Sequence, residues 1–258
     1  MHRFSRPISV AAFATLVGVL AFQTSSSANN SWGGYHWART SNPFTIKLGD
    51  NVGGEWDTYL GIASSDWSQS NVLDTVIVPG GTRPKTCKPT TGQVEVCNAT
   101  YGFNGWLGVA QIWINGSHIT QGIVKLNDSY FNTSTYNAWY WRQLVACQEI
   151  GHTFGLAHQD ETFGNGNLGT CMDYTNNPLG PPANTDPNQH DYDELATIYQ
   201  HTDSFTTIGA TTPSAAPMVL DNPSEWGRLM KTTRGGKTQV FERDFGNGQT
   251  IVTFVIWA

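Results

Sequence analysis

The sequence contains little charge. Asp, Glu, Lys and Arg make up 13% of the 258 residues, the 14 Lys and Arg residues form no basic stripe, and the formal net charge is −6. Binding to phosphate backbones needs such a stripe, so the composition disfavours nucleic acid as a partner. Beyond residue 22 there is also no apolar run near the roughly 20 residues that span a bilayer.

Cysteine is scarce as well, with four residues in the chain. They form none of the close C-x-x-C pairs that a cysteine-based zinc site needs. In an exported protein four cysteines suggest two disulfides, and three pairings are open. Their spacing favours Cys87 with Cys97 and Cys147 with Cys171. No cysteine lies between Ala28 and the first expected strand, so a thiol-switch zymogen is not expected.

The first residues have the order of a secretory signal peptide. A basic start is followed by an apolar run over residues 8–22 and by a small polar stretch that ends at Ala28. The alternative is a membrane anchor, but the apolar run is too short to span a bilayer. We therefore expect cleavage after residue 28, secretion, and no membrane partner once the signal is removed.

The remaining length fits one well-buried domain with a small appendage. We expect an α+β domain over residues 29–205, a linker over residues 206–217 rich in Thr, Ser, Ala and Pro, and a small β extension over residues 218–258 whose role is not legible. Alternation and helical spacing predict strands over residues 43–48, 72–78, 108–114 and 119–126, and helices over residues 55–68, 134–155 and 192–201. Residues 82–105 read as a surface excursion.

The chemistry concentrates in the segment that runs from Gln148 to His158, QEIGHTFGLAH. Residues four apart share one face of a helix, so position 148 and His152 can point at one metal ion while Glu149 reaches a water beside it. Gly155 can take a left-handed conformation that ends the helix, which lets His158 supply a further ligand. Three protein ligands and an open position are typical of a catalytic zinc site.

This segment resembles the metzincin clan of zinc metalloproteases, which includes the matrixins and astacins and whose pattern is H-E-x-x-H-x-x-G-x-x-H followed by a methionine-containing turn. The sequence matches at Glu149, His152, Gly155 and His158, and it has Gln148 in place of the first histidine. The resemblance implies a twisted mixed sheet, an active-site helix and a C-terminal helix. It also implies that Zn²⁺ is bound by His152, His158 and Gln148.

Downstream, the segment GTCMDY over residues 169–174 is similar to the methionine-containing turn of that clan. The resemblance implies that Met172 lies beneath the metal ligands and that Tyr174 lies near the metal, where it can stabilise an oxyanion. Three other residues are weighed as substitute ligands: His190, Asp160 and Asp173. The loop over residues 160–169 is rich in oxygen ligands and could bind Ca²⁺, but it lacks the regular D-x-D-x-D-G spacing.

Three functions follow from these observations. The first is a secreted, monomeric zinc endopeptidase that acts on a protein or peptide substrate, with Glu149 as general base and Tyr174 as a second catalytic residue. Its strand over residues 108–114 would pair with extended substrate. The second is an inactive binding protein on a protease scaffold, since a carboxamide is a poorer zinc ligand than an imidazole. The third is a glycan-binding module whose functional part is the C-terminal β segment.

Overall fold

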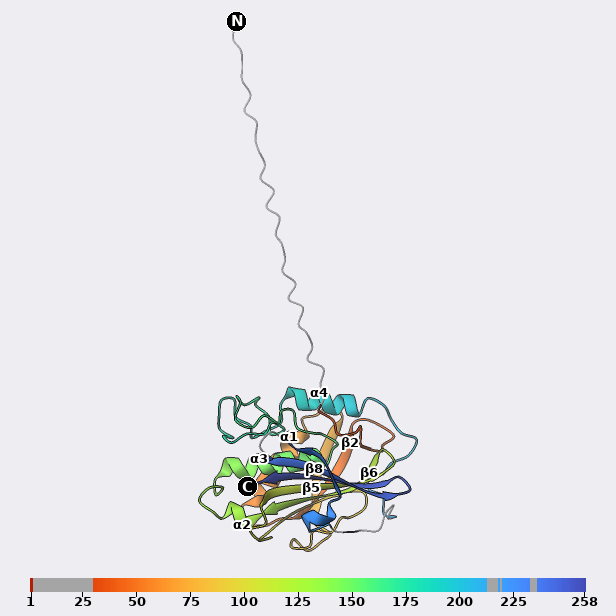
Figure 1. Ribbon diagram of the computed structural model, residues 1–258. Coiled ribbons are helices and arrows are strands. Elements are labelled where there is room, and N and C mark those ends of the chain that lie inside the picture. The colour runs from red at the N-terminus through yellow and green to blue at the C-terminus, as the bar shows by residue number, and fades with distance from the viewer. Residues whose placement is uncertain (2–29, 213–217, 219, 233–235) are drawn as a thin grey trace.

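The computed structural model describes residue 1, residues 30–212, residue 218, residues 220–232 and residues 236–258 (Figure 1). It shows an α+β protein with one nine-stranded mixed sheet. Eight of the strands follow the order β3-β2-β4-β6-β5-β9-β8-β7, and the ninth, β1, pairs with β6. The predicted signal peptide lies outside the described residues apart from Met1. Among the described residues, no helix is both long and apolar enough to cross a membrane.

The first part of the sheet is mainly parallel. Strands β2 (Phe44–Asn51), β3 (Leu73–Pro79), β4 (Val94–Ala99) and β6 (His118–Asn127) run in one direction, as does the short β1 (His36–Trp37). Strand β5 (Trp106–Asn115) runs antiparallel to β6, with which it forms the hairpin expected at Asn115-Gly116. In β2, Phe44, Ile46 and Leu48 are buried in alternation with exposed residues, as the sequence predicted.

Two helices pack against each other on one face of this sheet. Helix α1 (Trp56–Trp67) contacts β2 and β3, and helix α3 (Trp139–His152) contacts β5 and β6. Helix α3 begins at Trp139 rather than at residue 134 or 135, because the preceding residues form turns, and a short α2 (Asp128–Phe131) comes before them. Helix α4 (Gln189–Ile198) begins three residues earlier than expected because Asn188 and Asp191 form a capping box.

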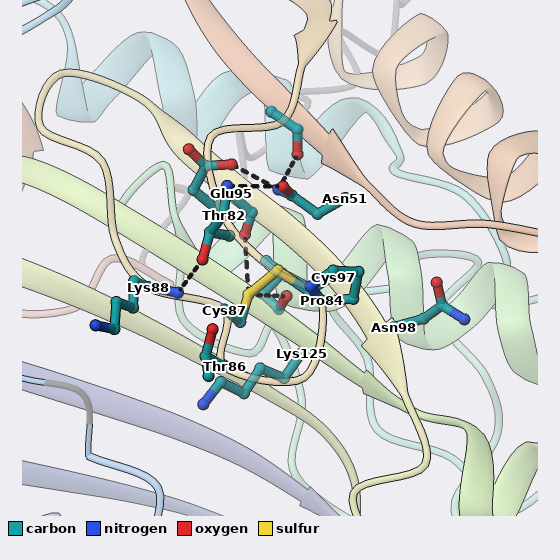
Figure 2. Close-up of a disulfide and its surroundings, with 12 residues drawn as sticks. Asn51, Thr82, Pro84, Thr86, Cys87, Lys88, Glu95, Cys97, Asn98 and Lys125 are labelled. Atoms are coloured by element: carbon teal, nitrogen blue, oxygen red, sulfur yellow. Dashed lines mark hydrogen bonds between the residues drawn. A yellow bond between two sulfur atoms is a disulfide. The ribbon is translucent and has the colours of Figure 1, made fainter.

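The expectation of a surface excursion over residues 82–105 was wrong, because β4 lies inside the sheet between β2 and β6. The charged Glu95 interrupts the apolar pattern by which this strand would have been predicted. Its side chain is fully buried, and it accepts hydrogen bonds from Asn51, Gln93 and the backbone N–H of Gly81. Figure 2 shows the contact of Glu95 with Asn51 beside the Cys87–Cys97 disulfide, which has an S–S distance of 2.07 Å and fastens the preceding loop to β4. This pairing is as predicted.

The C-terminal residues form the expected β-meander, and this meander continues the main sheet. After a 3-10 helix, η1 (Pro223–Glu225), strands β7 (Arg228–Thr232), β8 (Thr238–Gly246) and β9 (Gln249–Trp257) follow in order. Strand β9 pairs with β5 along its whole length (Figure 1). In the expected linker, Thr207 packs against the sheet and donates to the carbonyl of Ile119, whereas residues 213–217 lie outside the described part.

Candidate metal and peptidase site

Helix α3 ends inside the molecule and delivers the first residues of the site. Gln148, Glu149 and His152 lie in its last two turns, and all three are fully buried. Gly155 has a φ of +96°, the left-handed conformation predicted for it, and this turns the chain so that His158 comes back toward the helix. A β-carbon at this position would lie 2.2 Å from the carbonyl oxygen of Tyr35, so the close approach of the two backbones also requires glycine.

His152 and His158 lie side by side, and each directs its Nε2 atom toward the other. Their Nε2 atoms are 3.1 Å apart, close to the roughly 3.3 Å that separates two nitrogen ligands of one tetrahedral zinc ion. Nδ1 of His152 lies 2.9 Å from the carbonyl oxygen of Leu156, and Nδ1 of His158 lies 3.5 Å from a carboxylate oxygen of Glu161. These acceptors hold the proton on Nδ1 and direct the Nε2 lone pairs inward, as in metal-binding histidines.

Burial also favours the protonation state that binds metal. Desolvation first, and then the neighbouring His158, hold the pKa of His152 well below its usual range. The imidazole is therefore neutral at physiological pH. A neutral ring with a free Nε2 lone pair is the ligand form of histidine.

Gln148 and Glu149 have buried polar atoms without protein partners. Neither the amide oxygen nor the amide nitrogen of Gln148 has a hydrogen-bond partner, and the same holds for both carboxylate oxygens of Glu149. Burial raises the pKa of the Glu149 carboxyl well above its usual range, and the nearby backbone of Ala110 offsets part of that shift. The Glu149 carboxylate lies against Gly108 of β5, where a β-carbon would come within 2.7 Å of it.

This donor set fits a metal ion. Two histidine Nε2 atoms converge, and an unpaired carboxamide lies one helical turn before the first of them. Each orphaned polar group costs about 1–3 kcal/mol unless a ligand satisfies it. A zinc ion held by His152, His158 and the Gln148 oxygen, with a water near Glu149, would satisfy the groups that the protein itself does not.

The methionine-containing turn lies under this helix. Met172 is fully buried, and its sulfur lies 2.8 Å from where a β-carbon of Gly151 would be, next to His152. The Cys147–Cys171 disulfide, predicted from the spacing, joins the residue before Gln148 to the residue before Met172. The helix and the turn that frame the site are thus covalently tied.

Tyr174 lies beside the site, but its hydroxyl points to the C-terminal segment. Its ring centroid is 6.4 Å from that of His158. The hydroxyl donates to the carbonyl of Lys237 at 3.0 Å, with the carbonyl of Trp257 at 3.5 Å. Burial raises the pKa of this phenol, so it stays a hydrogen-bond donor. In the described conformation this donor is therefore used by the protein itself.

The other ligand candidates have local structural roles. Asp160 accepts from the backbone of Thr162, and Asp173 accepts from the backbone of Leu168 and from the side chain of Asn184. Within the described residues, neither His190 nor these carboxylates join His152 and His158 in one group of metal donors. Calcium binding by the loop over residues 160–169 has no support, because Asp160 uses its oxygens within the loop.

The C-terminal strands cover the site, which the sequence did not reveal. Phe254 of β9 stacks on His152, with ring centroids 4.2 Å apart and the planes 6° from parallel. It is paired in register with Ala110 of β5. Lys231 of β7 forms an ion pair of 2.9 Å with Glu161, the partner of His158. A residual cavity of about 30 Å³ is left between Tyr174, Trp257 and their neighbours.

The expectation that β5 offers a free edge to extended substrate was therefore wrong. β6 takes one edge of β5 and β9 takes the other. No sequence signal identifies Phe254 as a site residue, because it stands in a mostly apolar strand about a hundred residues from His152. Glu161 is similarly hidden in an acidic loop.

Comparisons with protein-family models and with curated protein sequences give no match. Among solved structures, the chain is similar to myroilysin, with 13% identity and a TM-score of 0.36, covering 63% of this chain and 82% of that one. It is also similar to high choriolytic enzyme 1, a hatching-enzyme zinc protease of the medaka fish Oryzias latipes, with 12% identity, a TM-score of 0.36, and coverage of 67% and 98%.

Proposed function

We propose that the chain is a secreted zinc-dependent endopeptidase with a metzincin-like fold, whose site is closed by its own C-terminal strands in the conformation described. The observation that carries the proposal is the convergence of the His152 and His158 Nε2 atoms beside the unpaired, buried side chains of Gln148 and Glu149. These four residues would supply three protein ligands and a proton-transferring carboxylate.

Each residue has a defined task in this proposal. His152, His158 and Gln148 would hold a zinc ion, which would lower the pKa of a water and polarise the scissile carbonyl. Glu149 would accept a proton from a water at the site and later deliver it to the leaving amine. Tyr174 can donate to the developing oxyanion once its hydroxyl is released from Lys237.

Substrate access requires β9 to move. Strand β9 fills the edge of β5 that β6 leaves, and Phe254 covers the ring of His152. Strands β7, β8 and β9 follow residues 206–217, so a cut or a hinge in that segment would allow them to withdraw. The cost is considerable, because Val252, Phe254 and Ile256 are part of the main hydrophobic core.

The closed site equally favours the second candidate, a catalytically inactive binding protein on the same scaffold. In that case the C-terminal strands would be a permanent part of the sheet, and Gln148 would mark a lost ligand. The third candidate, a separate glycan-binding C-terminal module, has less support. Trp226 is buried against Trp257 and Phe241 rather than presented on a surface.

The deciding experiment is zinc analysis of the purified secreted protein, combined with hydrolysis of an unstructured substrate such as casein. The protein is assayed intact and after limited cleavage within residues 206–217, with and without a chelator. The endopeptidase proposal expects chelator-sensitive hydrolysis that increases after cleavage. If zinc-reconstituted protein hydrolyses nothing in either form while a Gln148→His variant does, the chain is an inactive relative.

A further inference from the structure

A second group of metal-binding side chains lies outside the α3 site, where β1 pairs with β6. His36 of β1 and His118, the first residue of β6, are partners in register. His201 and Asp203 reach them from the segment that follows α4. The proposed peptidase function uses none of these four residues.

The donor atoms of this cluster converge on one carboxylate oxygen. Oδ1 of Asp203 lies 3.2 Å from Nε2 of His118, 3.7 Å from Nε2 of His36 and 3.8 Å from Nε2 of His201. The Nε2 atoms of His36 and His201 are 3.2 Å apart. Two ligands of one tetrahedral zinc ion are separated by about 3.3 Å, so the spacings among His36, His201 and Asp203 suit a single ion between them.

Hydrogen bonding alone does not explain the arrangement. The separations of 3.7 and 3.8 Å are longer than hydrogen bonds, yet both rings direct the same nitrogen at the same oxygen. His36, His201 and Asp203 are also the group of metal donors found within 4.8 Å of one another among the described residues.

Outer contacts hold these donors in a ligating orientation. Nδ1 of His36 donates to the carbonyl of Gly34 at 2.9 Å, which leaves its Nε2 lone pair free for a metal. The other oxygen of Asp203, Oδ2, accepts from the backbone N–H and the guanidinium of Arg39, at 3.2 and 3.1 Å. This fixes the carboxylate so that Oδ1 faces the histidines.

We propose that His36, His201 and Asp203 form a Zn²⁺ site, and that His118 holds the carboxylate of Asp203 in place through the contact of its Nε2 with Oδ1. Two imidazole nitrogens and one carboxylate oxygen are ligands that zinc prefers. A water would complete the tetrahedral coordination. The His201 side chain is half exposed, which gives the ion a path from solvent.

The site would fasten two segments that are far apart in the sequence, β1 and the segment that follows α4. β1 makes only a two-residue ladder with β6, and the chain after α4 leads toward the C-terminal strands. An ion that binds the folded state alone stabilises it according to its concentration and affinity. Removal of zinc should therefore lower the melting temperature even where no peptidase activity is present.

The test is the zinc content of the full chain, measured by mass spectrometry after dialysis against buffered trace zinc. His201→Ala should bind one zinc ion per chain fewer than the native chain. Its melting temperature should no longer depend on zinc at this site. His201 is half exposed, so the substitution leaves the core intact. The neighbouring Gln200→Ala is the matched control and should lose none. His158→Ala, which removes a ligand of the α3 site, should retain the zinc ion that His201→Ala loses.

His201→Ala should lose one zinc ion per chain even if the α3 site binds no zinc. Failure of the peptidase proposal can therefore be told apart from failure of the proposed His36–His201–Asp203 zinc site. Unchanged zinc content in His201→Ala would overturn the proposal. Crystals of the unmodified chain provide a second measurement that does not depend on any variant. Anomalous scattering at the zinc edge should show an ion between His36 and His201, and the lack of such a peak in zinc-loaded crystals would also overturn it.

Discussion

The buried side chains of Glu149 and Gln148 lower the stability of the folded protein. Both side chains are fully buried and leave their polar atoms without hydrogen bonds. An unsatisfied buried polar group costs about 1–3 kcal/mol, more when it carries charge. Residues that cost stability in this way are typical of functional sites, where the missing partner is a metal, a water or a substrate.

For Glu149→Gln we expect peptidase activity to fall by about a hundredfold or more, because the amide cannot carry the proton. The free energy of unfolding should stay the same or rise, since a neutral amide replaces an unpaired carboxyl. Activity on casein and urea unfolding measure the two effects. Glu194→Gln, which alters a buried glutamate of α4, is the control and should leave activity intact. Retained turnover in Glu149→Gln would assign the proton transfer to another group.

Substitutions at Gln148 test whether its amide oxygen binds zinc. Gln148→His should tighten zinc binding and Gln148→Ala should weaken it, each by about tenfold or more, since even changes in outer contacts of a metal have effects of that size. Gln148→Ala should also lower activity. Competition with a chromophoric chelator measures the affinities, and Gln143→Ala on the same helix is the control. Equal affinities in the native chain and Gln148→Ala would exclude this side chain as a ligand.

At the scale of the elements, the end of α3 depends on Gly155. Its φ is positive, and a β-carbon would meet the backbone of Tyr35 at 2.2 Å. Gly155→Ala should therefore destabilise the fold by more than the roughly 1 kcal/mol of the conformational strain alone and displace His158. In contrast, Gly61→Ala in α1 has open space and should stabilise the protein by about 0.5–1 kcal/mol. Thermal unfolding of both variants checks the opposite signs.

The elements that the sequence predicted are those with a local signal. The alternation of β2, the apolar face of α1 and the Asn115-Gly116 hairpin depend on neighbouring residues, and the structure has all three. Strand β4 was missed because its buried Glu95 is satisfied by Asn51 and Gly81, which are distant in sequence. The spacing from Gln148 to His158 similarly indicated a site, whereas the partner of His158, Glu161, becomes visible only in three dimensions.

At the scale of the whole molecule, the position of the C-terminal strands decides whether the site can work. The sequence showed a β-meander but not where it would lie, because strand pairing over a hundred residues leaves no periodic signal. In the structure this meander extends the sheet from β5 and brings Phe254 onto His152. The hydroxyl of Tyr174 donates to the carbonyl of Lys237, just before β8, and Lys231 of β7 forms an ion pair with Glu161. The C-terminal segment thus contacts His152, Tyr174 and Glu161.

The Phe254 ring should therefore act as a cover over the site, and Phe254→Leu tests this without emptying the core. Leucine keeps most of the apolar volume and loses the flat stack on His152, so we expect a destabilisation of about 1–2 kcal/mol and a several-fold rise in casein hydrolysis. Phe241→Leu makes the same change in β8, where the ring packs on Trp226 instead. It should lower stability less, because this ring is only partly buried, and leave hydrolysis at the native level. If both variants hydrolyse casein at the native rate, Phe254 does not control access; if both rise together, the gain reflects general loosening of the sheet.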